Sequence, residues 1–463
     1  MVHEIEPDLS ATLASRLGDW VAALRFDELP SRVVEVVKLV IIDQLGVQMR
    51  GATLSNVQPQ YRLVAAMHAA EESTICAKGT RTAAAYAAYV NGTFASSCEF
   101  DDCHSFAWHV GSYIVPTALA FGESTRALGR DVITSIVAGV QVMALLGCVT
   151  RDNMIRDGWH GAKVLGTFGA AATAGKLLDL SSAQLANAFG IAGSDAAGTM
   201  EYDTSGGEVK RMHAGSAGRN GSQAALLAKD GLTGPLTIFE GKRGLFQLFG
   251  KTEDILAINE LWDHLHVLDT IFRLYPVIGS ACPTLDAIHH LRKQHDFCWQ
   301  EIKAIRVGLM PFAVGHGASI TRPTDAVSAT FSTAFSMALL LIYGSNHPQD
   351  YMNPARWVDP AIISVIDRIT PYSAVFPDDA PLLSCRLDIQ LNDGRVLSHF
   401  QRGFRGHPNC PDTRDEDVTG KFLDNTNGII NIDIGRKIIA TVKDLDMLDD
   451  LGPLVELLAV SRS

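Results

Sequence analysis

The 463-residue chain has no run rich in lysine or arginine, and its formal net charge is −12. Proteins that bind nucleic acid neutralise phosphates with basic side chains, so this composition argues against that class. The eight cysteines stand singly, and none is spaced as Cys-x-x-Cys. Neither a zinc ribbon nor a disulfide framework is therefore expected.

Several catalytic signatures are also missing. The chain has no Gly-x-Ser-x-Gly elbow, no Walker A loop, and no Gly-x-Gly-x-x-Gly between a strand and a helix. These absences argue against a serine hydrolase of that type, a phosphate-loop enzyme and a dinucleotide dehydrogenase. The acidic first residues do not resemble a signal peptide. Two long uncharged stretches, 132–150 and 326–349, are interrupted by polar residues, which favours core helices over membrane spans. We expect a cytoplasmic protein.

The first 270 or so residues are mostly helical in pattern. Val33–Val47 is apolar all round, which predicts a helix buried on most sides. Thr82–Val90 is rich in alanine, and Asn91-Gly92 is its expected stop. Small residues dominate Leu165–Met200, with Ser181 and Ser182 as the two candidate N-caps of its second helix. Small side chains let helices approach closely, so this segment is predicted to form the tight centre of a helical core.

The pattern changes after about residue 270. Glu301–Met310 alternates apolar and polar residues as a half-buried strand does. Leu383–Leu391 and Arg395–Phe400 flank an Asp-Gly turn, which predicts a hairpin. Asp325–Tyr343 is predicted to be a helix, and helical spacing returns in Asp433–Val460. The fold class expected is mainly α with an α+β part, the smaller α+β domain being inserted before the last helices.

Polar side chains that could carry chemistry gather in four segments. They are Cys98–His109, Gly158–Gly161, Glu208–His213 and Arg273–Pro276. Apolar helices flank the first three segments, and polar groups among buried helices must be hydrogen-bonded or functional. The acidic run could be a solvated loop, and the histidines could be hydrogen-bonded core residues. A metal site is not predicted, because His-x-x-x-His on a helix and paired cysteines are both missing. Acids, histidines, a thiol and cations suit proton transfer beside a carboxylate without a cofactor.

At these residues the sequence resembles the MmgE/PrpD family, whose members include 2-methylcitrate dehydratase, cis-aconitate decarboxylase and iminodisuccinate epimerase. The matching segments follow the family's order over about residues 95 to 340. They are Glu99-Phe-Asp-Asp-Cys-His, Trp108-His109, Gly158-Trp-His160, Leu165-Gly-Thr-Phe-Gly-Ala-Ala-Ala, Lys210-Arg-Met-His213-Ala-Gly, Gly231-Leu-Thr-Gly-Pro, Phe239-Glu-Gly, Tyr275-Pro276 and Asp286-Ala.

The resemblance implies a helical domain formed by residues 1–268 and 405–463, an inserted α+β lid domain at 269–404, and a homodimer that binds a small carboxylate. It implies catalytic and substrate-binding residues without a metal or an organic cofactor. The expected catalytic residues are Glu99, Asp102, Cys103, His109, His160 and Lys210. The expected substrate-binding residues are His104, Lys210, His213 and Arg273.

Four positions depart from the family pattern. Glu99 stands for an aspartate, Cys103 for a threonine, Arg273 for a lysine and Phe335 for a tyrosine. A thiol can donate a proton, and loss of a tyrosine removes one acid, so these departures favour an epimerase of the iminodisuccinate type. A hydro-lyase of the 2-methylcitrate dehydratase type or a cis-aconitate-type decarboxylase is the alternative. A non-catalytic carboxylate-binding protein is the remote one.

Overall fold

The computed structural model describes residues 11–251, 256–381, 383–408 and 414–459. Packing divides the chain into two compact units. The helical unit contains the described residues of 1–97, 101–270 and 419–463, and the mixed unit contains those of 98–100 and 271–418. The mixed unit therefore includes most of the predicted lid segment, 269–404. The domain division itself stays a prediction.

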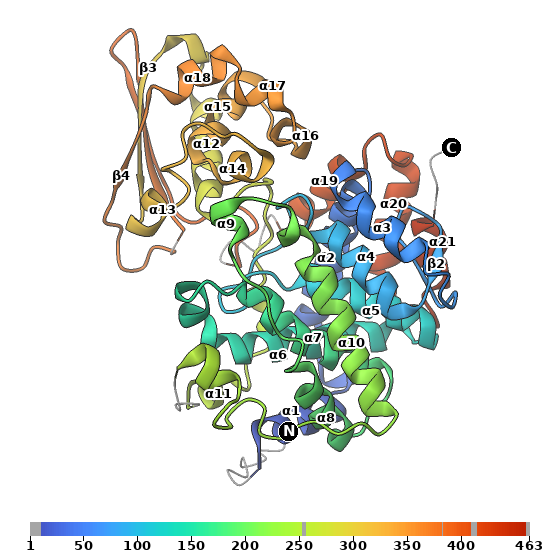
Figure 1. Cartoon of the computed structure of the whole chain (residues 1–463). Helices are drawn as coiled ribbons and strands as arrows, with labels where there is room; N and C mark the ends of the chain where they lie inside the picture. Colours follow the sequence, from blue (N-terminus) through green and yellow to red (C-terminus); the bar gives the residue numbers. More distant parts are fainter. Residues whose placement is uncertain (1–10, 252–255, 382, 409–413, 460–463) are drawn as a thin grey trace. The chain divides into compact units, whose positions relative to one another are not determined.

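The helical unit is built almost entirely from helices (Figure 1). Its longer helices are α1 (Leu13–Ala23), α2 (Ser31–Gly51), α3 (Gln58–Ala65), α4 (Ala84–Ser96), α5 (Gly111–Thr125), α6 (Gly129–Arg156), α7 (Gly161–Leu177), α8 (Ser182–Ala192), α10 (His213–Lys229) and α20 (Ile432–Lys443). Its shorter elements include α9 (Tyr202–Ser205), η3 (Val209–Met212), α11 (Leu256–Leu261), η5 (His266–Asp269), η9 (Leu445–Met447), α21 (Gly452–Leu458) and a two-stranded ladder of β1 (Ser73–Thr74) and β2 (Arg81–Thr82).

Small residues set the centre of this unit. α7 packs against α10 and α6, and α10 also packs against α4. A Cβ added to Gly221 on α10 would overlap the Thr167 carbonyl oxygen of α7. The predicted tight centre is confirmed for α7, whose residues are almost all buried. Of the two candidate N-caps, Ser181 caps α8 and Ser182 is the first residue of the helix, and the Gln184 side chain completes a capping box.

Two further sequence expectations can be compared with the helical unit. The predicted stop at Asn91-Gly92 is wrong, because α4 continues to Ser96. Asn91 instead uses its side chain to bind the backbone of the β1 segment, accepting from Cys76 N at 2.9 Å and donating to Thr74 O at 3.1 Å.

Among the described residues, α6 alone is long and apolar enough to span a membrane. However, 89% of its most apolar window is buried within the protein, as in a core helix.

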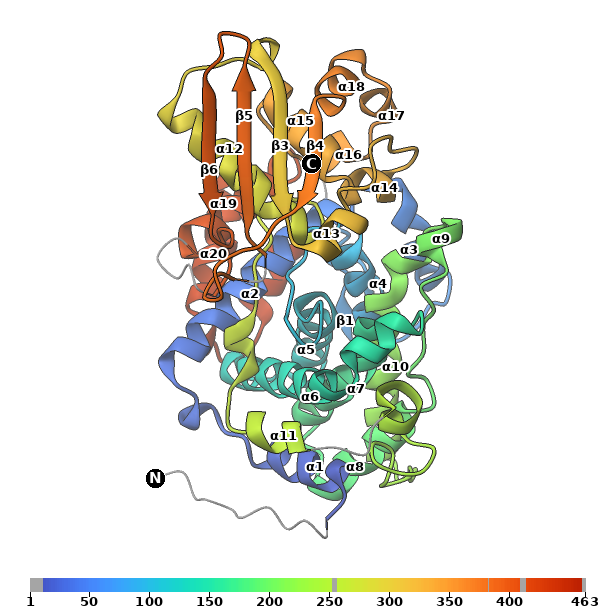
Figure 2. The ribbon, with the colours of Figure 1, turned by 90° about the vertical axis from the view of Figure 1, so that its left-hand side faces the viewer.

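The mixed unit contains a four-stranded sheet in the order β4-β3-β5-β6, which Figure 2 shows side by side. The strands are β3 (Ile302–Leu309), β4 (Ile369–Ser373), β5 (Cys385–Leu391) and β6 (Val396–Gln401). β3 pairs in parallel with β4, whereas the other pairs are antiparallel. The predicted strand and hairpin are thus confirmed. The alternating burial of β5 gives the sheet a buried face, and α12 (Cys282–Gln294) packs against β5 and β6.

The mixed unit also contains α13 (Pro311–Gly315), α14 (Ala326–Phe331), α15 (Thr333–Tyr343), α16 (Pro348–Tyr351), α17 (Pro354–Trp357) and α18 (Pro360–Ile366). The single helix predicted over Asp325–Tyr343 is wrong, because the segment forms two helices that meet at Ser332. The Ser332 side chain accepts from Phe335 N at 3.1 Å and so caps α15. A residue with this local hydrogen bond favours a new helix start over continuation. α19 (Arg414–Thr426) then includes the point where the chain returns to the helical unit at Thr419.

Candidate functional site

The segment 101–110 of the helical unit lies before α5 and carries several predicted site residues. It is folded back on itself, because His104 and Trp108 exchange backbone hydrogen bonds of 2.7 and 3.0 Å. Both carboxylate oxygens of Asp102 accept the backbone N–H of Gly111 at 3.0 Å. A carboxylate at the first turn of a helix is stabilised by the unpaired N–H groups there. Asp102 therefore holds this segment at the beginning of α5.

His109 is oriented by two acidic residues of the same segment. Its Nδ1 lies 2.9 Å from the Asp102 carbonyl oxygen and 3.2 Å from Oδ2 of Asp101. Asp101 is buried and also accepts from the Ser112 hydroxyl at 2.6 Å. Both neighbours of Nδ1 are acceptors, so this nitrogen carries the proton in the neutral ring. Nε2 is then the nitrogen with the lone pair, as in a histidine that acts as a general base.

A second histidine pair joins the beginnings of two central helices. His160 is the N-cap residue of α7, and His213 is the first residue of α10. Their Nδ1 atoms lie 2.7 Å apart, so one proton is shared between the two rings. The Tyr202 ring contacts both in edge-on fashion, with centroid distances of 5.8 Å to His160 and 5.7 Å to His213. Both histidines are buried.

Burial and neighbouring cations keep this pair neutral. Burial lowers the pKa of His213 to about 4, with further lowering by Lys163 and Lys210. The pKa of His160 lies well below its ordinary value, first through burial and then through His213, Lys210 and His109, while Asp101 opposes the shift. A neutral imidazole pair can either accept or donate a proton. These couplings also show that Lys210, on η3, lies in the electrostatic neighbourhood of both rings.

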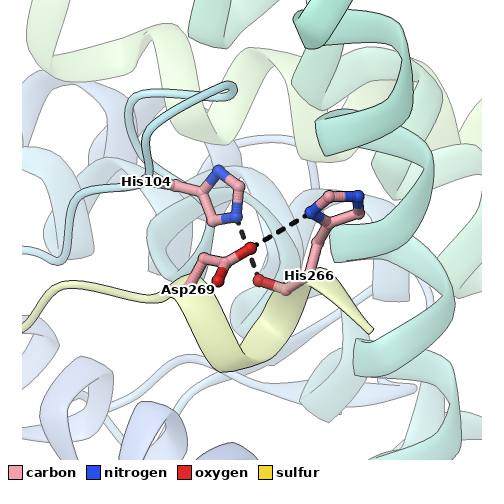
Figure 3. A group of neighbouring side chains, drawn as sticks. All are labelled: His104, His266 and Asp269. Atoms are coloured by element: carbon pink, nitrogen blue, oxygen red, sulfur yellow. Dashed lines mark hydrogen bonds and ion pairs between the residues drawn. The ribbon is translucent and has the colours of Figure 1, made fainter. Parts of the chain in front are cut away.

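His104 holds the 101–110 segment against η5. Its Nδ1 accepts the backbone N–H groups of Phe106 and Ala107 at 3.1 and 3.3 Å, and its Nε2 lies 3.0 Å from the His266 carbonyl oxygen. Figure 3 shows this contact together with the contact of 3.2 Å between Nδ1 of His266 and Oδ2 of Asp269. Both ring nitrogens of His104 therefore bind backbone groups. This geometry favours a positioning role over the predicted contact with substrate, which stays a prediction.

The same three residues offer atoms that could bind a metal ion. One potential ligand atom from each of His104, His266 and Asp269 lies within 4.8 Å of the others. A metal ion bound to His104 would replace hydrogen bonds that now fix its tautomer. His266 likewise directs both ring nitrogens at oxygens, Nδ1 at Asp269 and Nε2 at the Leu261 carbonyl. The hydrogen bonds of His104 and His266 therefore favour a network that joins the 101–110 segment to η5 over a metal site.

The burial of the His104 and His213 rings predicts that the stability of the protein depends on pH. The pKa of His104 is lowered to about 4 by burial, like that of His213. Between pH 6.5 and pH 4 the unfolded chain protonates these rings and the folded chain does not, so the free energy of unfolding falls as pH falls. The expected slope is about 1.4 kcal/mol per pH unit for each ring. Urea unfolding at several pH values gives the free energy of unfolding at each pH. Its dependence on pH should be weaker in His104→Asn than in the wild type. It should be unchanged in His68→Asn, since the His68 side chain is exposed.

Glu99 and Arg273 come together within the mixed unit. Arg273 Nη1 lies 3.7 Å from Oε2 of Glu99, and both side chains are buried. Arg273 also donates to the Val277 carbonyl at 3.2 Å. Glu99 has φ of +52°, a conformation that non-glycine residues rarely adopt. Two of the four departures from the family pattern are thus partners of one another.

Phe335 has the surroundings of a core residue. Its side chain is fully buried, and its ring contacts that of Tyr351 at a centroid distance of 5.8 Å within the mixed unit. The departure at Phe335 therefore bears on core packing, and it gives less support for a choice of reaction than Cys103 does. Cys103 is half-buried in the segment that carries His109.

The predicted residues thus form separate groups. His109 and Asp102 lie together, His160 and His213 form a pair near Lys210, and Glu99 binds Arg273 in the other unit. Sequence reasoning did not assign roles to Asp101 and Tyr202. Asp101 lies in the acidic run. Because that run could also be a solvated loop, nothing in the sequence singled out this one acid. Tyr202 lies outside the matching segments, so no signal could have pointed to it.

The sequence matches both domains of a known protein family. Residues 15–256 match the MmgE/PrpD N-terminal domain, and residues 275–447 match the MmgE/PrpD C-terminal domain. The chain belongs to the MmgE/PrpD family. The resemblance seen in the sequence and the mainly α fold class with an α+β part are therefore confirmed.

Relatives in the family include cis-aconitate decarboxylases. The chain is 26% identical to the cis-aconitate decarboxylase of Aspergillus terreus, over 96% of each chain. It is 26% identical to that of Homo sapiens, over 95% of this chain and 92% of the relative. It is 25% identical to the cis-aconitate decarboxylase-like protein oryM of Aspergillus oryzae, over 96% of this chain and 97% of the relative. These relatives are lyases by name, so they support the lyase alternative and not the epimerase.

Proposed function

We propose that the protein is a lyase that acts on a small di- or tricarboxylate and moves a proton at the carbon beside a carboxylate. The observation that carries the proposal is the pairing of His109 with Asp101, because a buried carboxylate at Nδ1 leaves Nε2 as the proton-transferring atom. The names of the relatives support the lyase class.

His109 is proposed to be the general base. With Nδ1–H held by the Asp102 carbonyl and Asp101, Nε2 can take a proton from the substrate carbon. Asp101 then balances the positive charge on the ring. The same atom can return the proton later, because the ring keeps its orientation in both states.

The His160–His213 pair is proposed to supply the second proton transfer. The two rings share one proton across 2.7 Å, so a proton lost or gained at His160 can be passed to His213. Lys210 is proposed to hold a substrate carboxylate. Its positive charge would also stabilise the enolate-like anion that forms beside that carboxylate.

In a decarboxylase, the carbon–carbon bond to one carboxylate breaks and its electron pair stays on the adjacent carbon as CO₂ leaves. A proton from the histidine pair then completes the product. In a hydro-lyase, the base removes a carbon-bound proton, and the departing hydroxyl takes a proton to leave as water. Both reactions need only the acid, base and cation named above. We therefore propose that no metal or organic cofactor takes part, and we expect dialysis against a chelator to leave turnover unchanged.

An epimerase of the iminodisuccinate type is the second candidate, and Cys103 favours it. Its thiol follows Asp102, whose carbonyl binds His109. A thiol and an imidazole could remove and return a proton on opposite faces of one carbon. The small-carboxylate partner and the homodimer implied by the family resemblance stay proposals, as does the cytoplasmic location expected from the sequence.

Proton NMR in D₂O tests the reaction. The purified protein is incubated separately with cis-aconitate, citrate, 2-methylcitrate and the stereoisomers of iminodisuccinate. Loss of CO₂ from cis-aconitate, or a new alkene signal from a hydroxy acid, would support the lyase. Deuterium at an α-carbon with loss of stereochemistry and no alkene would instead establish the epimerase. Ligand binding without any product would favour the non-catalytic alternative.

A further inference from the structure

A line of buried polar side chains in the helical unit begins on α19. Nζ of Lys421 lies 2.6 Å from Oδ1 of Asp43, with 3% of the lysine side chain and none of the aspartate side chain exposed. Asp43 lies in the middle of α2, among residues that are buried without interruption from Leu39 to Met49. The ion pair is therefore enclosed in the core.

Gln44, the next residue on α2, extends this line to the 101–110 segment. Its Nε2 lies 3.3 Å from Oδ2 of Asp43 and 3.4 Å from Oδ1 of Asp102. It is fully buried, like both carboxylates. One amide group thus faces two acids, one on its own helix and one in the segment that carries His109.

Asp102 connects this line to the histidine. Its side chain accepts the Gly111 N–H, and its backbone carbonyl accepts Nδ1–H of His109 at 2.9 Å. The position of this carbonyl depends on the position of the Asp102 side chain, since both belong to one residue. The contacts therefore run from Lys421 through Asp43, Gln44 and Asp102 to His109.

Stability alone gives a weak reason for such an arrangement. Bringing two charges out of water costs several kcal/mol per ion, and apolar residues of similar volume often stabilise a core equally well. A directional charge pair differs from an apolar pair because it fixes the orientation of the groups it touches. Here the group it touches next is the Gln44 amide, which faces Asp102.

We infer that Lys421, Asp43 and Gln44 are positioning residues, which hold Asp102 so that its carbonyl fixes the Nδ1–H tautomer of His109. The catalytic consequence rests on the proposed function, whereas the effect on the tautomer does not. Loss of Lys421 would remove the cation that orients the Asp43 carboxylate, and the Gln44 amide beside that carboxylate would then be held less firmly toward Asp102. The Asp102 carbonyl would then hold His109 less well, and Asp101 would be left as the main acceptor at Nδ1, so that the ring would populate the second neutral tautomer in part.

The test compares Lys421→Met, Lys421→Arg and the double variant Asp43→Leu/Lys421→Met with the wild-type chain. The matched control is Lys38→Met, which removes a different lysine–aspartate pair, Lys38 with Asp446, from the same helix α2. The first measurement is the ¹⁵N spectrum of the histidine rings, with the His109 signals assigned from their loss in His109→Asn. The second is kcat and KM over a range of pH, on whichever substrate is turned over.

We expect the wild type and Lys38→Met to show His109 with Nδ1–H, and Lys421→Met to show both tautomers. Kcat should fall about tenfold in Lys421→Met with KM within about twofold, the size typical of residues that orient a catalytic group. Lys421→Arg should recover much of the loss. If Lys421→Met fails to fold, the double variant, which removes both charges of the pair, replaces it.

Wild-type His109 signals and kcat in the folded double variant would overturn the inference and leave the ion pair a purely structural contact. A similar change in Lys38→Met would also overturn it, because the effect would then follow from any loss on α2. If no substrate is turned over by the wild type, the proposed function fails, and the ring spectra still decide the positioning role.

Discussion

His109→Asn is expected to lower kcat by about three orders of magnitude while the protein stays folded. The asparagine amide can replace Nδ1–H as the donor to the Asp102 carbonyl and Asp101, but it has no counterpart of Nε2. The substitution therefore removes the proposed base and keeps the hydrogen bonds of the segment. Loss of a general base typically costs about 10²- to 10⁴-fold in rate. Product formation followed by proton NMR gives kcat, and circular dichroism monitors the fold.

His68→Asn serves as the control, because His68 is exposed and asparagine tolerates its φ of +49°. It should keep wild-type kcat. A His109→Asn variant that retains more than about a tenth of the activity would reject His109 as the base, since a general base contributes at least about 10²-fold. Asp101→Asn should lie between these variants, because Nδ1 keeps its bond to the Asp102 carbonyl.

Gly215→Ala is expected to lower the free energy of unfolding by about 3 kcal/mol, the upper end for an added methyl group that the core cannot accommodate. Gly215 lies on α10 where this helix crosses α4. A Cβ there would overlap the Tyr89 carbonyl oxygen and lie 2.5 Å from Oγ1 of Thr93. Backbone atoms of a buried helix cannot move aside as the end of a flexible side chain can. Urea denaturation should show a lower midpoint with an unchanged slope.

Gly420→Ala is the matched control, since it adds the same methyl group within helix α19. A Cβ at Gly420 meets nothing within 4 Å. Because alanine has the higher helix propensity, this variant should gain up to about 1 kcal/mol. Equal stability of Gly215→Ala and the wild type would show that α4 and α10 can separate at their crossing.

The local sequence was sufficient to predict those elements in which the spacing of apolar residues matches the pattern of buried positions. β5 and β6 follow from alternation around Asp393-Gly394, and α2 follows from its continuous apolar residues. The wrong helix end at Asn91-Gly92 arose because a distant partner decided the local structure, whereas the break at Ser332 came from a local cap. Asn91-Gly92 has the composition of a helix end, yet Asn91 binds the β1 segment and Gly92 packs closely against Gly215. A partner so far along the chain leaves no trace in the local sequence.

The same distinction applies to the candidate site. The residues of the acidic run and the histidines could be selected because polar groups are unusual beside buried helices. Their pairing could not be predicted, since His160 and His213 are neighbours only because α7 and α10 begin at the same place. The Lys421–Asp43 pair joins residues from two helices far apart in the sequence, so neither residue stood out.

The discontinuity of the helical unit affects the order in which a newly made chain can fold. Residues 419–459 supply α20, which packs against α2, and η9, which packs against α6. The ribosome makes them after the whole of the mixed unit, although α2 and α6 are among the first helices to emerge. Domains tend to fold as units during translation, and the mixed unit takes only residues 98–100 from outside its continuous stretch. Until α20 and η9 have been synthesised, the apolar surface that they cover on α2 and α6 is exposed. Chaperones that bind exposed apolar surface can act during that interval.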